Sequence, residues 1–303
     1  MIMADDITNL INAMRKGYQQ SSNAPTSIQV EKDLDIQSRT VVEQTFLEFL
    51  EQKNRTRDIK SNNVTFYKES GGSDASFIAE VGDIPDYTAK NLTEVTKETK
   101  TLVIPMKISM KAQDGTVDKD LRTWLIKDNY VKLNNLMDKT LLTGNTSSDV
   151  NSFDSILKDI TTISNSNETI DEATIKSTIQ TCISSGGHPD CLVTNAEVAN
   201  QIDELVSPYI RYNNVTEIAL GHTVSTFKST DGSFIPILVD SNMPEGQLAV
   251  LDTTGIDVVY QKRPSIIQFA QTNLATNEAI FAWATAYNKA TFKSRVITNI
   301  GSE

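Results

Sequence analysis

The sequence predicts an α+β fold, because strand patterns and helix patterns are mixed along one chain. In "TLVIPMKISM", residues 101–110, apolar side chains alternate with others at the two-residue period of a half-buried strand. In residues 114–145, a longer apolar stripe has the spacing of a helix. A chain of 303 residues can hold one large domain or two smaller ones and can bury a large core.

Composition and charge argue against several classes of protein. The formal charge of -11 lies in residues 150–260, which hold 15 acidic and 4 basic side chains, while the rest of the chain has 24 of each. No stretch is basic, so we expect no protein that grips nucleic acid through its phosphates. No apolar run is long enough to span a membrane, and the N-terminus is acidic and amphipathic, unlike a secretion signal. We expect an intracellular, soluble product.

The first 63 residues predict a helical arm. Residues 5–17 have the pattern of a short amphipathic helix, and the polar linker "YQQSSNAPTS" follows it. A second helix is expected from about Ser38 to Lys53, where apolar side chains recur at helical spacing. We expect the two helices to be too little to form a core alone. The apolar side of the first helix consists of Ile7, Leu10, Ile11 and Met14.

Residues 64–112 predict an extended segment whose second half enters a core. The stretch "NLTEVTKETKT" is β-prone but carries charge on both alternating sets, with Leu92 and Val95 as its only apolar side chains. The strand after it has a clean apolar face made by Leu102 and every second residue to Met110. A strand is therefore expected to start in solvent and to continue into a core.

Residues 113–150 predict the longest helix. Its stripe covers about 27 residues, which at 1.5 Å per residue is a helix on the order of 40 Å. Asp114 and Thr116 open it, and Gly144 and Asn145 end it. The stripe consists of Val117, Leu121, Trp124, Leu125, Leu133, Leu136, Met137 and Leu141.

The acidic half alternates strands and helices. A helix is expected after a capping box made by Thr169 and Glu172, with a stop at Gly186-Gly187. A strand from Cys191 to Val193 precedes a helix capped by Asn195. Turns at Asp231-Gly232 and Thr254-Gly255 predict two hairpins. The last segments are expected to be mostly strands, although the alanines of "AIFAWATAYN" leave a helix possible.

The inventory of reactive side chains is thin. Cys182 and Cys191 match no metal or redox spacing, and His188 and His222 fall in predicted loops. The sequence has no glycine-rich dinucleotide fingerprint and no serine in a nucleophile elbow. We therefore expect no catalytic residue, no metal and no cofactor.

The stretch "FIAEVGDIPDYTAKNLTEVTKETKTLVIPMKISMKAQDG" resembles the major capsid proteins of tailed phages and related archaeal viruses, which share the Hong Kong 97 fold. "CLVTNAEVANQIDEL" and "SFDSIL" are similar to segments of the same family. Where many members continue the last strand with a glutamate-leucine-leucine and aspartate-serine pattern, this chain has "MKAQDG", which indicates a distant branch. The elements that carry the resemblance are Phe77, Ala79-Glu80, Ile84-Pro85, Val95 with Lys97 and Lys100, and Ile104 to Ser109.

The resemblance implies a Hong Kong 97-like division of the chain. Residues 1–63 would be an N-terminal arm and 64–112 an extended loop draped over a neighbouring copy. Residues 113–150 would be the spine helix of a peripheral domain, 151–265 mostly an axial domain, and 266–303 strands that return to both. The loop residues expected between subunits are Phe77, Ile84, Tyr87, Val95 and Lys97.

The implied function is a shell of self-associating subunits. Pentamers and hexamers would build an icosahedral virion capsid in the host cytoplasm, and the capsid would enclose double-stranded DNA without sequence-specific binding. Portal, scaffold and decoration proteins are possible partners, and no membrane is expected. Some members crosslink a loop lysine to an asparagine. Lys90, Lys97 and Lys100 lie on that stretch, but no asparagine or activating glutamate matches, so we expect no crosslink.

Three alternatives stay open. An encapsulin-type nanocompartment would keep the fold and load a cargo enzyme. An α+β hydrolytic enzyme would need a cleft lined by carboxylates of perturbed pKa, whereas a shell subunit needs none. A surface-layer or tail component is disfavoured by the missing signal peptide and the single long helix.

Overall fold

The computed structural model describes residues 45–70, 77, 86, 88–109, 121–165, 169–206, 216–219, 222–224, 226–229, 231–270 and 275–301. Contacts divide the chain into residues 1–37 and 38–303, and the described residues all belong to the second unit. Its helices are α2 (Thr45–Gln52), α4 (Leu121–Thr143), α5 (Glu172–Ser184) and α6 (Ala196–Val206), with 3-10 turns η1 (Thr253–Gly255) and η2 (Thr291–Lys293). Its strands are β1 (Thr56–Asp58), β2 (Asn63–Ser70), β3 (Asn91–Glu98), β4 (Lys100–Ser109), β5 (Thr161–Ser164), β6 (Cys191–Thr194), β7 (Thr216–Ala219), β8 (His222–Val224), β9 (Thr226–Lys228), β10 (Phe234–Val239), β11 (Leu248–Leu251), β12 (Ile256–Gln268), β13 (Ala275–Asn288) and β14 (Arg295–Thr298). The predicted α+β class is confirmed.

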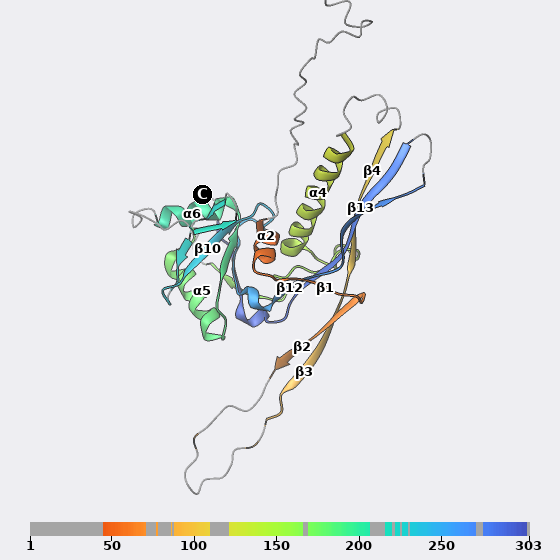
Figure 1. The fold of residues 1–303 in the computed structure, drawn as a ribbon. Helices are drawn as coiled ribbons and strands as arrows, with labels where there is room; N and C mark the ends of the chain where they lie inside the picture. The colour runs from red at the N-terminus through yellow and green to blue at the C-terminus, as the bar shows by residue number, and fades with distance from the viewer. Residues whose placement is uncertain are drawn as a thin grey trace, which may run out of the picture. The chain divides into compact units, whose positions relative to one another are not determined.

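A four-stranded sheet in the order β1-β12-β13-β4 forms one half of this unit. β12, β13 and β4 are antiparallel, and β13 pairs Ile280 with Ile104 at the middle of β4. The predicted apolar face of β4 is confirmed, since Leu102, Met106 and Ile108 are buried. The segment with many alanines, for which a helix had been possible, is the long strand β13. Figure 1 shows α4 running alongside β4 and β13.

Helix α4 packs on this sheet through a stripe with four-residue steps, Leu133, Met137 and Leu141, all of which are buried. Its 23 residues correspond to about 35 Å, and the predicted start before Leu121 lies outside the described residues. Trp124 and Leu125, which the stripe predicts as core residues, are half-buried. The prediction for Leu136 is wrong: its side chain is 45% exposed, because three residues after Leu133 the helix has turned past the buried side.

A six-stranded sheet in the order β5-β14-β11-β6-β10-β9 forms the other half, with its own apolar cluster shared with α5 and α6. The hairpin at residues 231–232 is confirmed as the β9–β10 turn, and Asn195 caps α6 by accepting the Val198 N–H at 3.0 Å. The capping box at the start of α5 is wrong. The N-cap is Asp171, and its side chain makes no capping hydrogen bond.

The predicted hairpin at Thr254-Gly255 is also wrong. β11 belongs to the six-stranded sheet and β12 to the four-stranded sheet, so η1 between them carries the chain from one sheet to the other. Gly255 is required there for close packing, since a Cβ at this position would lie 2.9 Å from the side chain of Ala290. From the sequence alone, a glycine next to a threonine can therefore indicate either a turn or a close approach of two chain segments.

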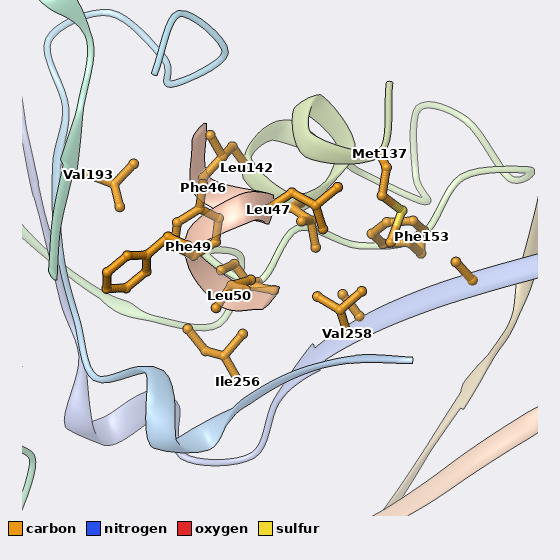
Figure 2. Packing of buried hydrophobic residues seen from close by; sticks show 14 of the residues in the cluster. Phe46, Leu47, Phe49, Leu50, Met137, Leu142, Phe153, Val193, Ile256 and Val258 are labelled. Atoms are coloured by element: carbon orange, nitrogen blue, oxygen red, sulfur yellow. The ribbon is translucent and has the colours of Figure 1, made fainter. Parts of the chain in front are cut away.

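Helix α2 lies inside the body, in contrast to the expectation that the second helix of the arm would have no local core. Phe46, Leu47, Phe49 and Leu50 are each at most 3% exposed. Figure 2 shows these side chains between the two sheets, close to labelled residues of both. Those neighbours are Met137 and Leu142 of α4, Val193 of β6, and Ile256 and Val258 of β12. The second predicted helix is thus part of the core that joins the two halves.

Candidate functional site

The reactive side chains that the sequence offers include two cysteines and two histidines. Cys182 and Cys191 are buried free thiols, and burial raises the pKa of both, that of Cys182 to about 11. His188 is exposed, and it is its backbone N–H that donates to Asp252. Within the part of the chain that the structure describes, no group of three or more histidine, cysteine, aspartate or glutamate side chains could hold a metal ion. Across the same residues, no helix is long and apolar enough to cross a membrane.

The most distinctive feature is a two-stranded ribbon formed by β2 and β3. The strands pair antiparallel from Asn63 with Glu98 to Ser70 with Asn91, and β3 leads directly into β4, as Figure 1 shows. Because side chains alternate across a two-stranded ribbon, one set faces the body and the other faces away. The two faces have different chemistry.

The inner face anchors the ribbon to its own chain. Val64 and Phe66 are buried and form an apolar cluster with Val259 and Tyr287, and Val95 packs against it. The rings of Phe66 and Tyr287 are stacked with centroids 4.6 Å apart. This root differs from the expectation that the strand starts in solvent, because the ribbon buries a small apolar face that is supplied mainly by β2.

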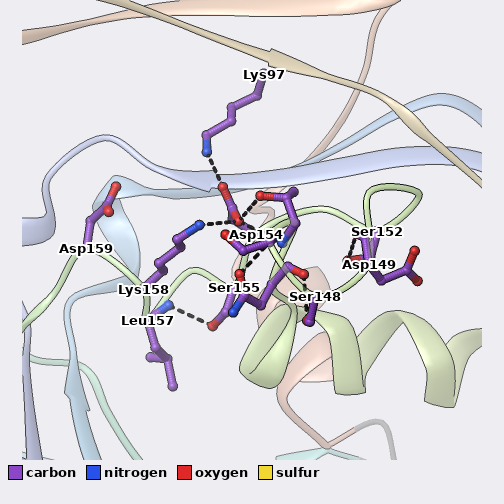
Figure 3. Close-up of polar contacts among 12 residues, drawn as sticks. Lys97, Ser148, Asp149, Ser152, Asp154, Ser155, Leu157, Lys158 and Asp159 are labelled. Carbon is purple, nitrogen blue, oxygen red and sulfur yellow. Dashed lines mark hydrogen bonds and ion pairs between the residues drawn. The ribbon is translucent and has the colours of Figure 1, made fainter.

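Ion pairs reinforce the root. Lys97 donates to Asp154 at 3.0 Å, Lys158 donates to the same carboxylate at 2.6 Å, and Lys68 lies 3.4 Å from Asp159. Figure 3 shows Lys97 and Lys158 reaching Asp154 from different segments. Burial by itself would raise the pKa of Asp154, but hydrogen bonds from Lys158, Thr146 and Lys97 outweigh it and hold that pKa well below its usual range. The ribbon is therefore latched at its base.

A cavity of about 150 Å³ lies at the latch, with Lys68, Lys97, Asp154 and Asp159 among its walls. A general acid or base would need a carboxyl whose pKa is raised toward neutrality. The carboxylate of Asp154 is instead kept ionised by two lysines. The geometry fits a structural latch better than the cleft expected of a hydrolytic enzyme.

We expect Asp154→Asn to lower the free energy of unfolding by about 2 kcal/mol at pH 7, because the hydrogen bonds from Lys97 and Lys158 lose their charged acceptor and the amide has only one oxygen left to accept. A depressed folded-state pKa contributes stability above the unfolded-state pKa, and that contribution is lost as pH falls toward the folded-state value. The difference between wild type and variant should therefore be constant above about pH 4 and shrink below it. Urea unfolding at several pH values measures this. Asp149→Asn, an exposed change in the same loop, is the control, and an equal loss there would contradict the latch.

The outer face of the ribbon has no cover among the described residues. Tyr67 is 61% exposed and Leu92 is 66% exposed, on neighbouring strands of the ribbon. Thr65 and Thr96 lie opposite each other beside them, with their hydroxyl oxygens 3.2 Å apart, and Glu94 is opposite Tyr67. Large apolar side chains at this exposure, on a ribbon held rigidly at its root, are typical of a surface that another molecule covers.

The predicted loop residues do not all lie on one surface. Phe77 is fully exposed. Val95 is half-buried at the root, and Lys97 pairs with Asp154 of its own chain. Ile84 and Tyr87 lie outside the described residues, as do the arm positions Ile7, Leu10, Ile11 and Met14. The intersubunit role of these residues stays a prediction.

Sequence reasoning missed β2 and the partners of the latch. A signal for β2 was present, since in "NVTFYKES" the apolar Val64 and Phe66 alternate with Thr65 and Tyr67 at the period of a strand. Asp154 had no such signal. Only the fold brings the loop after α4 beneath β3.

Comparisons with known proteins agree with this architecture. Residues 36–301 match the family described as SU10 major capsid protein. No curated protein matches the chain.

Three of the similar solved structures share the fold along most of the chain. The capsid of a cyanophage, A-1(L), has a TM-score of 0.68 at 12% identity and covers 92% of this chain and 99% of its own. The capsid of a native GTA particle has a TM-score of 0.63 at 12% identity and covers 91% and 99%. The SrpI encapsulin of Synechococcus elongatus PCC 7942 has a TM-score of 0.66 at 10% identity and covers 94% and 95%. At these identities, the likeness concerns the fold alone.

Proposed function

Because this chain belongs to the SU10 major capsid protein family, we propose that its copies assemble through pentamers and hexamers into an icosahedral shell around double-stranded DNA. Membership makes it a structural protein of a phage-like, Hong Kong 97-like capsid, not an enzyme. We also propose that the shell assembles in the host cytoplasm, with portal, scaffold and decoration proteins as partners.

The observation that carries the proposal is the two-faced ribbon. Its root is fixed to the body by the stacked pair Phe66 and Tyr287 and by the Lys97–Asp154 ion pair. Its outer face leaves Tyr67 and Leu92 open. A second copy of the chain is the occupant we propose, because repeated contacts of one surface with another on the next copy close into rings, and rings can tile a shell.

The charge distribution supports a container that does not hold its content tightly. Residues 150–260 carry 15 acidic side chains and 4 basic ones. Each lysine or arginine contact with phosphate raises affinity for nucleic acid, and strong binding to the wall would impede filling. We therefore propose that the DNA is enclosed without sequence-specific contact.

Electron microscopy of the purified, full-length chain tests the proposal. Closed particles with five-fold and six-fold groups of subunits are the expected result. A chain that stays monomeric at high concentration would contradict assembly by this chain alone. Particles that retain a cargo enzyme and no DNA after expression in the native host would instead favour the nanocompartment, whose fold this chain shares with the SrpI encapsulin.

The proposed shell is held together without covalent bonds between subunits. Lys90 pairs with Glu69, Lys97 with Asp154 and Lys100 with Glu98, so each of these three lysines forms an ion pair within its own subunit. A protonated lysine is a poor nucleophile. Boiling particles in detergent should give one band of subunit size on a gel. A ladder of multimers would show that crosslinks form.

A further inference from the structure

Two carboxyl groups meet in the core where α2 begins. Asp138 comes from α4 and is 0% exposed, and Asp240 follows β10 and is 1% exposed. Asn242 brings the two carboxyl groups together, since it donates to both of them. They lie where α2, α4 and the six-stranded sheet meet, since the core cluster includes Leu47, Met137 and Leu238 from these elements. The ribbon and its latch do not involve either residue.

The pair holds the first turn of α2. The Leu47 N–H donates to Asp138 Oδ1 at 2.7 Å, and the Phe46 N–H donates to Asp240 Oδ2 at 3.3 Å. First-turn amides have no partner inside a helix and need an acceptor from elsewhere. Carboxyl groups 91 and 194 residues away along the chain supply acceptors for these amides.

The same carboxyl groups bind the turn after β10. Asn242 donates its side-chain amide to Asp138 Oδ2 at 3.1 Å and its backbone N–H to Asp240 Oδ1 at 2.9 Å. All of these donors are neutral. Among the described residues, no salt bridge reaches either carboxyl group. Two adjacent carboxylates without a cation repel each other strongly in a core, so one of them is favoured in the protonated form.

The charged side chains on the surrounding elements do not change this balance. On α2 they are Glu48, Glu51 and Lys53, and Lys53 lies 4.0 Å from Asp190. On α4 the neighbouring charge is Lys139, and on the turn after β10 it is Glu245, both exposed. Burial, and next the hydrogen bond with Asp240 and its charge, raise the pKa of Asp138 to about 9. The hydrogen bonds from Leu47 and Asn242 lower it less.

We propose that Asp138 is protonated in the folded subunit and forms with Asp240 a pH-sensitive clasp that holds α2 against α4 and β10 and opens as pH rises. The clasp is a property of the folded subunit and does not depend on assembly into a shell. Its protonated form has one carboxyl O–H to donate to the other carboxylate while both accept first-turn amides. Loss of that proton leaves two like charges in the core.

The sign of the pH dependence follows from the raised pKa. The folded clasp keeps a proton that an opened or unfolded Asp138 loses above about pH 4. The closed state therefore loses stability as pH rises from about 4 to the folded-state value of about 9. With one proton involved, the equilibrium constant for opening should rise by about tenfold per pH unit in this window.

Hydrogen exchange measured by mass spectrometry on the full-length chain tests the clasp. Protection of the α2 peptide, corrected for the intrinsic exchange rate at each pH, should fall by about tenfold per pH unit between pH 6 and pH 8.5. Asp138→Asn keeps an acceptor for Leu47 and a donor for Asp240 without a titrating proton, so its protection should be independent of pH. Asp240→Asn removes the neighbouring charge but leaves Asp138 buried, so the dependence on pH should persist and end at a lower pH than in the wild type. Asp154→Asn, which changes a carboxylate of lowered pKa outside the clasp, should keep the wild-type slope.

Infrared spectroscopy gives a second readout that does not depend on the variants folding. At pH 7 the wild-type chain should show the carbonyl band of a protonated carboxylic acid, and the band should vanish at alkaline pH. In Asp138→Asn it should be absent at pH 7. Protection of α2 that is flat with pH in the wild type, or a wild-type spectrum without the acid band at pH 7, would overturn the proposal.

Discussion

Phe46→Ala should lower the free energy of unfolding by about 3 to 5 kcal/mol, the range for truncating a fully buried phenylalanine. The ring is 0% exposed and belongs to the cluster that joins the two sheets. Removing it leaves a cavity between elements that are held by their strand pairings and cannot collapse fully. Urea unfolding of the full-length chain, followed by the fluorescence of Trp124 and Trp283, measures the loss.

Phe234→Ala is the matched control for this change. Phe234 is also a phenylalanine in a regular element, but it is 60% exposed on β10, so its truncation should change the free energy of unfolding by less than about 0.5 kcal/mol. A small effect of Phe46→Ala, similar to that of the control, would mean that α2 contributes little to the core. Such a result would restore the view of this helix as part of an arm.

Helix α2 shows what can and what cannot be predicted from the spacing of apolar residues. The spacing of Phe46, Phe49 and Leu50 was enough to predict a helix. It carries no information on what covers the apolar side, because the covering residues come from α4, β6 and β12. Placing this helix in an arm was therefore an assumption about what covers it, and the residues that cover it lie within the same chain.

Among the strands, too, some features could be predicted from local sequence and others could not. The face of β4 was predictable because alternation is local, and Leu102 and Met106 are buried as expected. The passage of the chain through η1 into a second sheet could not be predicted, because a threonine-glycine pair fits either a hairpin turn or a close approach of two chain segments. The latch and the clasp could not be predicted from the sequence for a further reason. Asp154, Asp138 and Asp240 are ordinary carboxylates in sequence, and only long-range packing gives them their roles.

Tyr67→Glu combined with Leu92→Glu should reduce the yield of assembled particles strongly while leaving the subunit folded. Both side chains are more than 60% exposed, so the change removes little packing within the subunit. If a second copy covers this face, as we propose, the variant places two additional carboxylates in a buried interface, where unpaired charge is strongly unfavourable. Particle yield by sedimentation and electron microscopy, together with urea unfolding of the subunit, separates the two effects.

The matched control is Phe234→Glu, a charge introduced at an aromatic residue of similar exposure outside the ribbon. Unchanged particle yield for the ribbon variant would contradict a role of this face in assembly. Equal loss in both variants would point to a general effect of added negative charge on a chain with a formal charge of -11. A selective loss in the ribbon variant, with the free energy of unfolding preserved, is the result expected if the inner face maintains the fold and a second copy covers the outer face.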